Sequence, residues 1–341
     1  MGLFSNDITG VDIGAGSIKV VRLSRGGNRP RLLSAMLVEL SPDPAVAASV
    51  SSDLHHLQTG KKIGGANVVT LMPGKHLTIR PLTLPKMPLN ELREAVRWEA
   101  KRHISYPVDS AQIEYLIVGE KLEGVVEKYD IVMVAAERAK VLEQLAPFNA
   151  AKIKVSAVDA NALALRNVLR TRELPVDENT LVVDLGAGKT EVNIFKGGML
   201  RFSRCVESGG LDMTRAIAEA LNIGFQEAED KKRALNILTP ADQDPAIAAL
   251  QPRVDGLLME IRRSVEYYKT TFREKNVEGM ILSGGVSLMR GLRDYIAQSL
   301  EGTVELDRPF DGLICKKKML YEYGPVAPRF SAAIGLALRK G

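Results

Sequence analysis

The stretch Val11-Asp-Ile-Gly-Ala-Gly-Ser-Ile-Lys-Val20 decides how this sequence folds, because a second copy, Val183-Asp-Leu-Gly-Ala-Gly-Lys-Thr-Glu-Val192, occurs near the middle of the chain. Six of the ten positions are identical, among them the aspartate and the Gly-Ala-Gly that follows. Two copies separated by about half of the 341 residues are too few for a solenoid of stacked repeats. They predict instead two similar lobes that face each other across a cleft.

Each copy of this repeat predicts a β-hairpin. Apolar residues that favour strands lie at 9–13 and 18–23 around the first copy, and at 181–185 and 191–195 around the second. The glycines between them predict a tight turn, because glycine permits the positive φ that lets successive backbone N–H groups converge on an anion. Two ordinary hairpins with glycine turns are the alternative. Two matched copies at half-chain spacing favour phosphate binding.

The side chains around the two turns divide into metal and phosphate ligands. A carboxylate repels phosphate but can hold hydrated Mg²⁺ through water, so we expect Asp12 and Asp184 to hold the metal ion. The phosphate donors are then expected among the turn residues and their neighbours, namely Gly14, Gly16, Ser17, Lys19, Gly186, Gly188, Lys189 and Thr190.

A third glycine site lies in Met280-Ile-Leu-Ser-Gly-Gly-Val-Ser287. The apolar residues 280–283 predict a short strand, and a helix is expected from about residue 288 to 300. Between them, Gly284 and Gly285 would let a flat base and its ribose approach the backbone. A simple left-handed turn is the alternative for this segment taken alone.

Composition narrows the class of protein. The chain is 45% hydrophobic and 26% charged, as in soluble globular proteins, and its length suggests about two domains. The net charge of +5 is compatible with a phosphate ligand, an anionic membrane or nucleic acid, but a solvated basic face explains it equally well. Two cysteines without metal-ligand neighbours indicate a reducing cytoplasm, and no segment approaches the ~20 apolar residues of a membrane span.

The three glycine segments, in this order, resemble the phosphate and adenosine motifs of the actin/Hsp70/hexokinase superfamily of ATP-binding proteins. The resemblance implies an α/β, actin-like (ribonuclease H-like) two-lobed ATPase fold, with ATP and Mg²⁺ as cofactors. It also implies two connecting helices at the hinge, at 158–164 and 330–338. Further nucleotide contacts are implied for Gly209 and Gly210, before a helix near Asp212, and for Glu229 and Lys232, which share one helical face.

A narrower resemblance covers essentially the whole chain and is to the PilM family, the actin-like, FtsA-related cytoplasmic proteins of type IV pilus assembly. It rests on an opening segment with Leu3 and Phe4, and on the segments 99–107, 260–268, 308–310 and 335–339. The resemblance implies that the partner is the cytoplasmic N-terminal peptide of a PilN-like membrane protein, held in a groove between lobe one and an insertion. It further implies contacts with other pilus platform components, no nucleic acid, and a cytoplasmic location at the inner face of the inner membrane, reached only through a partner. Self-association is left open.

Residues 77–156 are expected to form the insertion. Their pattern predicts strand, helix, strand, strand, helix, strand, a βαββαβ order typical of a ferredoxin-like α+β subdomain. With the resemblance, the chain divides into subdomain 1A (1–76), the inserted subdomain 1C (77–156), a return to 1A with the connecting helix (157–178), 2A (179–210), 2B (211–276), 2A again (277–325) and the C-terminal connecting helix of 1A (326–341).

Catalytic candidates are Asp184, Asn161 and Glu191. Many relatives orient the attacking water with a glutamate at the start of the first connecting helix, where this sequence has Asn161. An amide can bind water but cannot take its proton, so we expect slow or negligible hydrolysis. Asp159, which would take this place if the alignment is shifted by a turn, and Glu191, beside the second predicted phosphate turn, are the alternatives, although a structural role is favoured for each.

Two other functional classes remain open. A small-molecule kinase would need an acceptor pocket and a carboxylate base, and the sequence has no acceptor pattern. An FtsA-like, filament-forming division protein would be expected to carry an amphipathic membrane helix after the last connecting helix, whereas this sequence stops at Gly341. Among the remaining features, the apolar stripe at 250–268 and the single tryptophan, Trp98, are expected to pack in the core.

Overall fold

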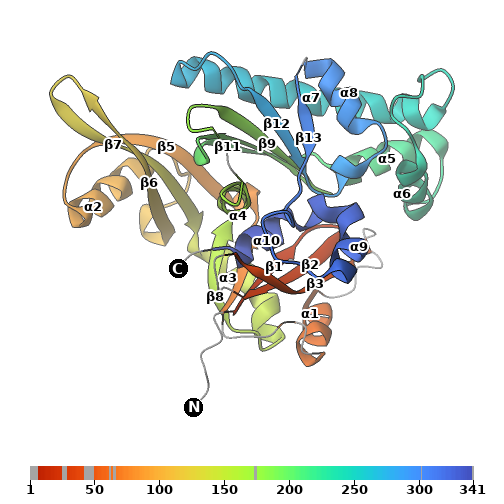
Figure 1. Cartoon of the computed structure of the whole chain (residues 1–341), viewed down its shortest axis with the longest axis horizontal. Helices are drawn as coiled ribbons and strands as arrows, with labels where there is room; N and C mark the ends of the chain where they lie inside the picture. The colour runs from red at the N-terminus through yellow and green to blue at the C-terminus, as the bar shows by residue number, and fades with distance from the viewer. Residues whose placement is uncertain are drawn as a thin grey trace.

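The computed structural model describes residues 7–24, 29–41, 50–60, 63, 67–172, 175–300 and 302–339. The opening segment with Leu3 and Phe4 lies outside these ranges. Within them the chain forms two lobes, an inserted subdomain and a pair of helices between the lobes (Figure 1).

Each lobe is built on a five-stranded sheet, and the two sheets have the same topology. The first has the order β3-β2-β1-β4-β8 and the second β11-β10-β9-β12-β13. In both, three antiparallel strands are followed by two parallel ones. The strands of the first sheet are β1 (Asp7–Ile13), β2 (Ser17–Ser24), β3 (Arg31–Glu39), β4 (Asn67–Met72) and β8 (Val155–Ala160). Those of the second are β9 (Asn179–Leu185), β10 (Thr190–Lys196), β11 (Met199–Val206), β12 (Gly279–Ser283) and β13 (Val304–Leu306).

This duplication confirms the prediction of two similar lobes from the repeated hairpin. The predicted hairpins are β1–β2 and β9–β10, and the repeated Asp-x-Gly-x-Gly lies at the turn of each. In β10, six successive residues from Thr190 to Phe195 are buried, as expected for a strand covered on both faces.

Two helices cross between the sheets, α4 (Asn161–Leu169) and α10 (Ser331–Ala337). Their close approach depends on Gly335, because a Cβ there would lie 2.0 Å from the backbone oxygen of Ala164. Gly10 plays the same part under α10, where a Cβ would lie 2.1 Å from Ala333 O. The first connecting helix begins later than predicted, since residues 158–160 extend β8 along β4.

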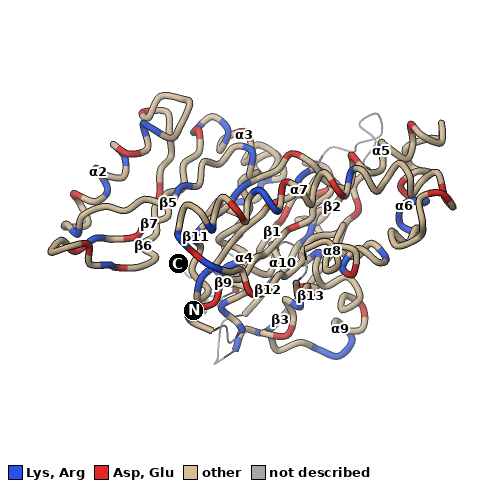
Figure 2. Tube along the Cα trace, turned by 90° about the horizontal axis from the view of Figure 1, so that it is seen from above, with Lys and Arg blue, Asp and Glu red and all other residues tan. Residues whose placement is uncertain are grey.

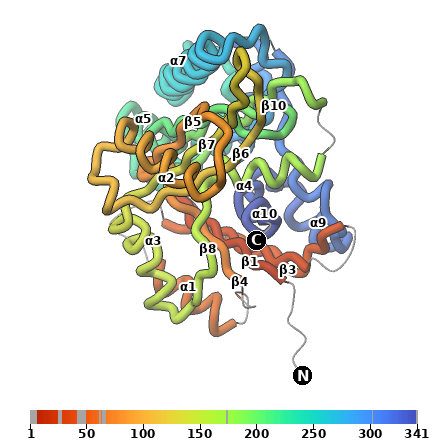
Figure 3. The backbone as a smooth tube through the Cα atoms, turned by 90° about the vertical axis from the view of Figure 1, so that its left-hand side faces the viewer, coloured from red at the N-terminus to blue at the C-terminus, as the bar shows by residue number. Residues whose placement is uncertain are grey.

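The inserted subdomain stands out from the first lobe at the left of Figure 1. It contains β5 (Leu77–Pro85), α2 (Leu89–Ala100), β6 (Ala111–Glu123) and β7 (Val126–Glu137), with the antiparallel order β5-β7-β6. The βαββαβ order is the predicted one, but one detail differs: the last helix, α3 (Arg138–Ala150), and β8 complete the first lobe. The reason is apolar burial. Helix α3 lies near α1 (Val50–Thr59) in Figure 3, and Phe148 of α3 is buried in one cluster with Leu54 of α1 and Val11.

The prediction that Trp98 packs in the core is wrong. Helix α2 covers its sheet with Leu92, Val96 and Ala100, spaced four residues apart, and Trp98 points away from that stripe. Its side chain is 67% exposed, and the Lys101 ammonium lies 3.7 Å from its ring centroid.

The outer part of the second lobe is helical, with α5 (Gly210–Leu221), α6 (Phe225–Ala234) and the long α7 (Pro245–Phe272). The predicted stripe on α7 is confirmed as core, from Leu250 through Ile261 to Tyr268. Asp244 caps α7 by accepting from Ala246 N at 2.8 Å, and Pro245 fills its first position.

The remaining elements are short. After β12, a 3-10 turn, Val286–Leu288, precedes α8 (Leu292–Leu300), which therefore starts four residues later than predicted because Gly291 turns the chain at φ 78°. The others are the helix α9 (Lys317–Tyr323) and the 3-10 segments Gly74–His76, Val108–Ser110 and Gly324–Phe330. Basic and acidic positions are interspersed along both lobes (Figure 2), so the net charge of +5 is spread over the molecule.

Candidate functional site

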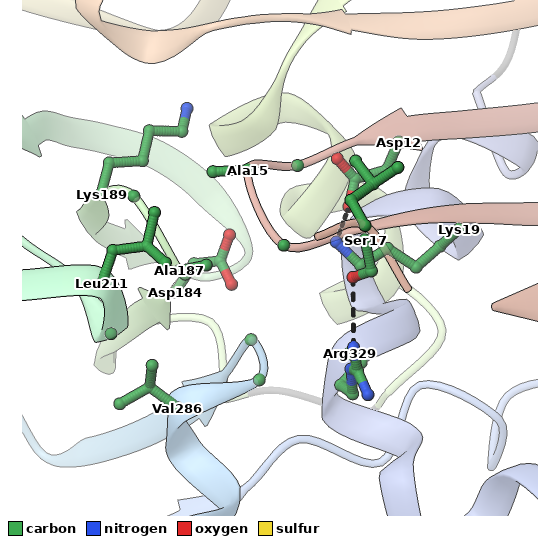
Figure 4. A pocket seen from close by; sticks show the side chains of 18 of the residues that line it. Asp12, Ala15, Ser17, Lys19, Asp184, Ala187, Lys189, Leu211, Val286 and Arg329 are labelled. Carbon is green, nitrogen blue, oxygen red and sulfur yellow. Dashed lines mark hydrogen bonds and ion pairs between the residues drawn. The ribbon is translucent and has the colours of Figure 1, made fainter. Parts of the chain in front are cut away.

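A cleft of about 850 Å³ lies where the repeated turns of the two lobes face each other (Figure 4). It brings together most of the residues predicted for nucleotide binding. The predicted residues that line it are Asp12, Gly14, Gly16, Ser17, Lys19, Asn161, Asp184, Gly186, Gly188, Lys189, Gly210, Glu229, Lys232, Gly284 and Gly285. Their roles in binding stay predictions, and Thr190, Glu191 and Gly209 lie behind the wall of the cleft.

The two turns approach each other at their tips. A Cβ at Gly16 would lie 3.2 Å from the Cβ of Ala187, and one at Gly188 would lie 3.1 Å from the Cβ of Ala15. Each turn is closed by one internal hydrogen bond, Gly14 N to Ser17 O at 3.0 Å and Gly186 N to Lys189 O at 2.9 Å. The repeat in the sequence is therefore a pair of matching turns on opposite sides of one space.

Asp184 is held by two protein donors at the floor of the cleft. Its Oδ2 accepts from Asn161 Nδ2 at 2.6 Å, and its Oδ1 accepts from Ser283 Oγ at 3.0 Å. Burial, followed by the charge of Glu191, raises the pKa of the Asp184 carboxyl above its ordinary value. Within the described residues, Asn161 Oδ1 is buried without a hydrogen-bond partner.

On the first turn, Asp12 is paired with a cation. Lys19 Nζ lies 3.0 Å from Asp12 Oδ2, and both side chains are mostly buried. A Cβ at Gly14 would lie 2.9 Å from Lys19 Nζ, so glycine leaves the room that the ammonium occupies. Figure 4 shows Asp12, Ser17 and Lys19 on one side of the cleft, with Asp184 and Lys189 on the other.

The residues beside the second turn have structural partners. Lys189 forms an ion pair with Glu191, which is 3% exposed and packs against Gly74. Thr190 donates its hydroxyl to Ser208 O at 2.9 Å. Asp159, the alternative base, pairs with Arg339 at 3.2 Å and does not line the cleft. The position of Asn161 beside Asp184 therefore makes it the candidate for orienting a water molecule.

In the second lobe, Lys232 is the centre of a buried network. Its ammonium donates to Gly210 O at 2.9 Å, Thr214 Oγ1 at 2.6 Å and Glu229 Oε2 at 2.6 Å. All three N–H groups are thus used, and burial lowers the pKa of Lys232 despite the opposing charge of Glu229. The network fixes the wall of the cleft from α5 to α6.

Glycine is required at two places near this wall, at Gly209 behind it and at Gly284 on the cleft itself. At Gly209 a Cβ would lie 2.6 Å from Ala187 O, and the N–H of Gly209 donates to Asp212 Oδ2 at 3.0 Å, which starts α5. Gly284 has φ 82°, and a Cβ there would lie 2.4 Å from Leu185 O. Glycine is therefore needed at both places for packing against the protein's own backbone, and only Gly284 also lines the cleft.

Five charged residues that line the cleft were not predicted from the sequence, and two of them, Glu39 and Arg329, form a pair. Arg329 donates from Nη1 to Glu39 Oε1 at 2.7 Å and from Nη2 to Glu39 Oε2 at 2.8 Å. Arg329 Nη2 also lies 3.2 Å from Ser17 Oγ, as the dashed line in Figure 4 marks. One feature of the sequence could have identified Arg329 as a cleft residue: it directly precedes the small, apolar residues of the last connecting helix. No pattern in the sequence indicated that Glu39, at the end of β3, lines the cleft.

The donor set fits a nucleotide polyphosphate with a hydrated magnesium ion. The cleft is lined by six cationic side chains, by two aspartates on opposing turns, and by glycines that let the backbone approach a ligand. The unpartnered Asn161 Oδ1 next to Asp184 suits a metal-bound or free water molecule.

Comparison with known proteins gives one family match over nearly the whole chain. The family model described as type IV pilus assembly protein PilM matches residues 10–341. Among solved structures, a PilM–PilN type IV pilus biogenesis complex is similar with a TM-score of 0.83 and 28% identity, covering 97% of this chain and 98% of that chain.

More distant likenesses concern the fold. EutJ, an ethanolamine utilization protein of Carboxydothermus hydrogenoformans, has a TM-score of 0.56 at 14% identity, over 97% of this chain and 89% of its own. MreB 5 of Spiroplasma citri, solved with AMPPNP, has a TM-score of 0.52 at 12% identity, over 97% and 94%. Together with the duplicated sheets, these structures confirm the predicted actin-like fold.

Curated relatives match over a shorter length. The cell division protein FtsA of Enterococcus faecalis is 27% identical over 154 residues, which are 39% of this chain and 34% of that protein. The chain thus spans about a third of this relative. Across the described ranges, no helix has both the length and the apolar character that crossing a membrane requires.

Proposed function

The chain belongs to the PilM family of type IV pilus assembly proteins, and we propose that it is an ATP-binding scaffold that recruits the cytoplasmic N-terminal peptide of a PilN-like membrane protein. The observation that carries the nucleotide part is the pair of apposed Asp-x-Gly-x-Gly turns, with Asp12 and Asp184 on opposite sides of one cleft. The family match and the similarity to a PilM–PilN complex support the pilus part.

In this proposal each group at the cleft has a defined task. Asp12 and Asp184 hold hydrated Mg²⁺, while Ser17, Lys19 and Lys189 bind phosphate oxygens. The glycines at 284 and 285 admit the adenosine, and Glu229 and Lys232 keep the opposite wall in place. When bound, Mg²⁺ would neutralise phosphate charge, and the nucleotide would hold the two lobes together.

Hydrolysis is proposed to be slow or absent. Asn161 stands beside Asp184, and an amide can orient a water molecule without accepting its proton. Glu191 forms an ion pair with Lys189, and Asp159 forms one with Arg339, so neither carboxylate is placed to act as the base. The bound nucleotide is therefore proposed to act as a structural element.

The partner is proposed to dock between lobe one and the inserted subdomain of β5, α2, β6 and β7. The protein would then work in the cytoplasm at the inner face of the inner membrane, attached through its partner and next to other platform components. An FtsA-like filament protein is the second candidate, and the local similarity to FtsA favours it over a kinase.

One sample tests both parts of the proposal. The protein is purified in Mg²⁺, denatured to identify any released nucleotide by chromatography, and titrated with a synthetic PilN N-terminal peptide. Trp98 is the only tryptophan and lies exposed on α2 of the inserted subdomain, so its fluorescence reports on docking there. We expect intact ATP and saturable peptide binding. Empty protein that turns over added ATP and ignores the peptide would overturn the proposal.

A further inference from the structure

Two consecutive residues, Pro328 and Arg329, connect the glycine turns of the two lobes. Pro328 O accepts from Gly284 N at 2.9 Å, which ties it to the turn after β12 in the second lobe. The side chain of Arg329 reaches the other way, to Ser17 Oγ in the first phosphate turn. A Cβ at Gly285 would lie 3.7 Å from Arg329 Nε, so the side chain runs along the cleft from the Gly-Gly turn to the phosphate turn.

Glu39, the carboxylate that pairs with Arg329, lies where an incoming phosphate group could replace it. The Arg329 side chain is 18% exposed, whereas that of Glu39 is 49% exposed at the mouth of the cleft. The hydrogen bonds from Arg329 hold the pKa of Glu39 below its ordinary value, so Glu39 occupies the guanidinium as an anion at neutral pH. A guanidinium fork binds carboxylate and phosphate with the same paired geometry. An ion pair with one side open to water is weakly held, and a polyphosphate can displace it.

We propose that Arg329 is a phosphate ligand of the bound nucleotide, and that Glu39 occupies its guanidinium until the nucleotide takes its place. The inference rests on the proposed ATP binding and adds a residue and an exchange step to it. Nothing in the repeated turns identifies Arg329, because it comes from a third segment of the chain.

The position of Arg329 couples the exchange of Glu39 for phosphate to the two connecting helices, α4 and α10. Ser331, two residues on, begins α10, which has no spare room on either side. Gly335 sits against the backbone of Ala164 in α4, and Gly10 of β1 sits against the backbone of Ala333. A shift of the Arg329 backbone therefore moves α10 together with the elements that join the two lobes.

Substitutions at the two partners have opposite expected effects. With full-length protein and Mg²⁺, calorimetric titration of ATP should show binding about 10- to 100-fold weaker for Arg329→Met, which loses a charged pair of donors. Glu39→Gln should bind ATP about 3- to 10-fold tighter, because the competing anion is gone. In the double variant, Glu39→Gln should add nothing to Arg329→Met, since it acts through the guanidinium.

A matched control separates this exchange from a general charge effect. Glu207 is another exposed carboxylate that lines the cleft, and Glu207→Gln should tighten ATP binding by no more than about twofold. Hydrogen exchange adds a second readout: ATP should slow exchange of the α10 amides in the wild type but not in Arg329→Met. Thermal unfolding without nucleotide checks that every variant is folded.

The outcomes are distinguishable. If the wild type binds ATP and a folded Arg329→Met variant binds it with the same affinity, this inference alone is overturned. Weaker ATP binding by Glu39→Gln than by the wild type would also overturn it. A wild type that binds no ATP in Mg²⁺ would overturn the proposed function and this inference with it.

Discussion

Asn161 donates its side-chain amide to Asp184 Oδ2 over 2.6 Å, and within the described residues the oxygen of the same amide is buried without a partner. The contact joins the start of the first connecting helix to the end of β9, beside the second Asp-x-Gly-x-Gly turn. It places a group that can orient water, but cannot deprotonate it, next to a predicted magnesium ligand.

Asn161→Glu should raise ATP hydrolysis. A general base contributes roughly 10²- to 10⁴-fold to such reactions, and we expect at least about a tenfold increase in phosphate release. Asn161→Gln is the matched control, because it has the same length but no base, and it should stay at the wild-type rate. A Glu variant that is folded and no faster than the Gln variant would show that position 161 does not limit hydrolysis.

Asp184→Asn should stabilise the protein in the absence of metal. The folded-state pKa of Asp184 lies above the ordinary value of 3.8. The protonated carboxyl therefore contributes fully to folding stability below pH 3.8, and this contribution is lost as the pH rises through the raised pKa. The substitution removes this loss. We expect the Tm in EDTA to rise by about 2–4 °C at neutral or higher pH, and the gain to shrink as the pH is lowered.

The control for Asp184 is the equivalent aspartate of the other lobe. Asp12→Asn leaves Lys19 without its 3.0 Å partner, so it should lower the Tm. Both variants should lose Mg²⁺-dependent ATP binding. Equal Tm changes in the two variants would contradict the difference in their surroundings.

Gly335→Ala and Gly256→Ala should change stability in opposite directions, although both glycines lie inside helices. The Cβ at 335 would meet the backbone oxygen of Ala164 at 2.0 Å, and overpacking of this kind costs about 1–3 kcal/mol or more. At Gly256 in α7, a Cβ meets nothing within 4 Å, so alanine should stabilise by about 0.5–1 kcal/mol. Urea unfolding measures both, and a harmless Gly335→Ala would mean that the two connecting helices pack differently.

Lys232→Met should destabilise the second lobe by about 3–5 kcal/mol, because the mostly buried Glu229 loses its buried cation and keeps only Thr214 and the exposed Arg233 as partners. The neighbouring Lys231 lies exposed on the same helix, and Lys231→Met should stay within about 0.5 kcal/mol of the wild type. Urea unfolding compares the two. A similar, small effect for both would indicate that water replaces the lost hydrogen bonds.

The elements best predicted from the sequence were those with a local cause. The hairpins at Asp12 and Asp184 follow from apolar, strand-forming runs on both sides of glycine turns, and the repetition predicted two lobes that face each other. The stripe on α7 followed from helical spacing alone. Each of these patterns is complete within a few neighbouring residues.

The features that the sequence could not reveal depend on distant contacts. The Arg329–Glu39 pair joins residues almost 300 positions apart. Strand β8 leaves the insertion because β4 offers a parallel partner, which no pattern inside 77–156 indicates. Trp98 is exposed because the sheet under α2 is only three strands wide and is covered by Leu92, Val96 and Ala100. The apolar character of Trp98 alone did not determine whether its side chain faces the sheet or the solvent.

Helix α10 has a consequence for how the chain is made. One core cluster contains Phe330, just before α10, and Ala333 and Ile334 within it. Its other members include Val21, Leu23 and Leu32 from the first hairpin and its neighbour. During synthesis, the apolar residues that these first strands contribute to this cluster are not fully covered until residue 334, about 300 positions later, has left the ribosome. Translation that stops before residue 330 would leave lobe one without its closing helix, so such products are expected to be captured by chaperones or degraded.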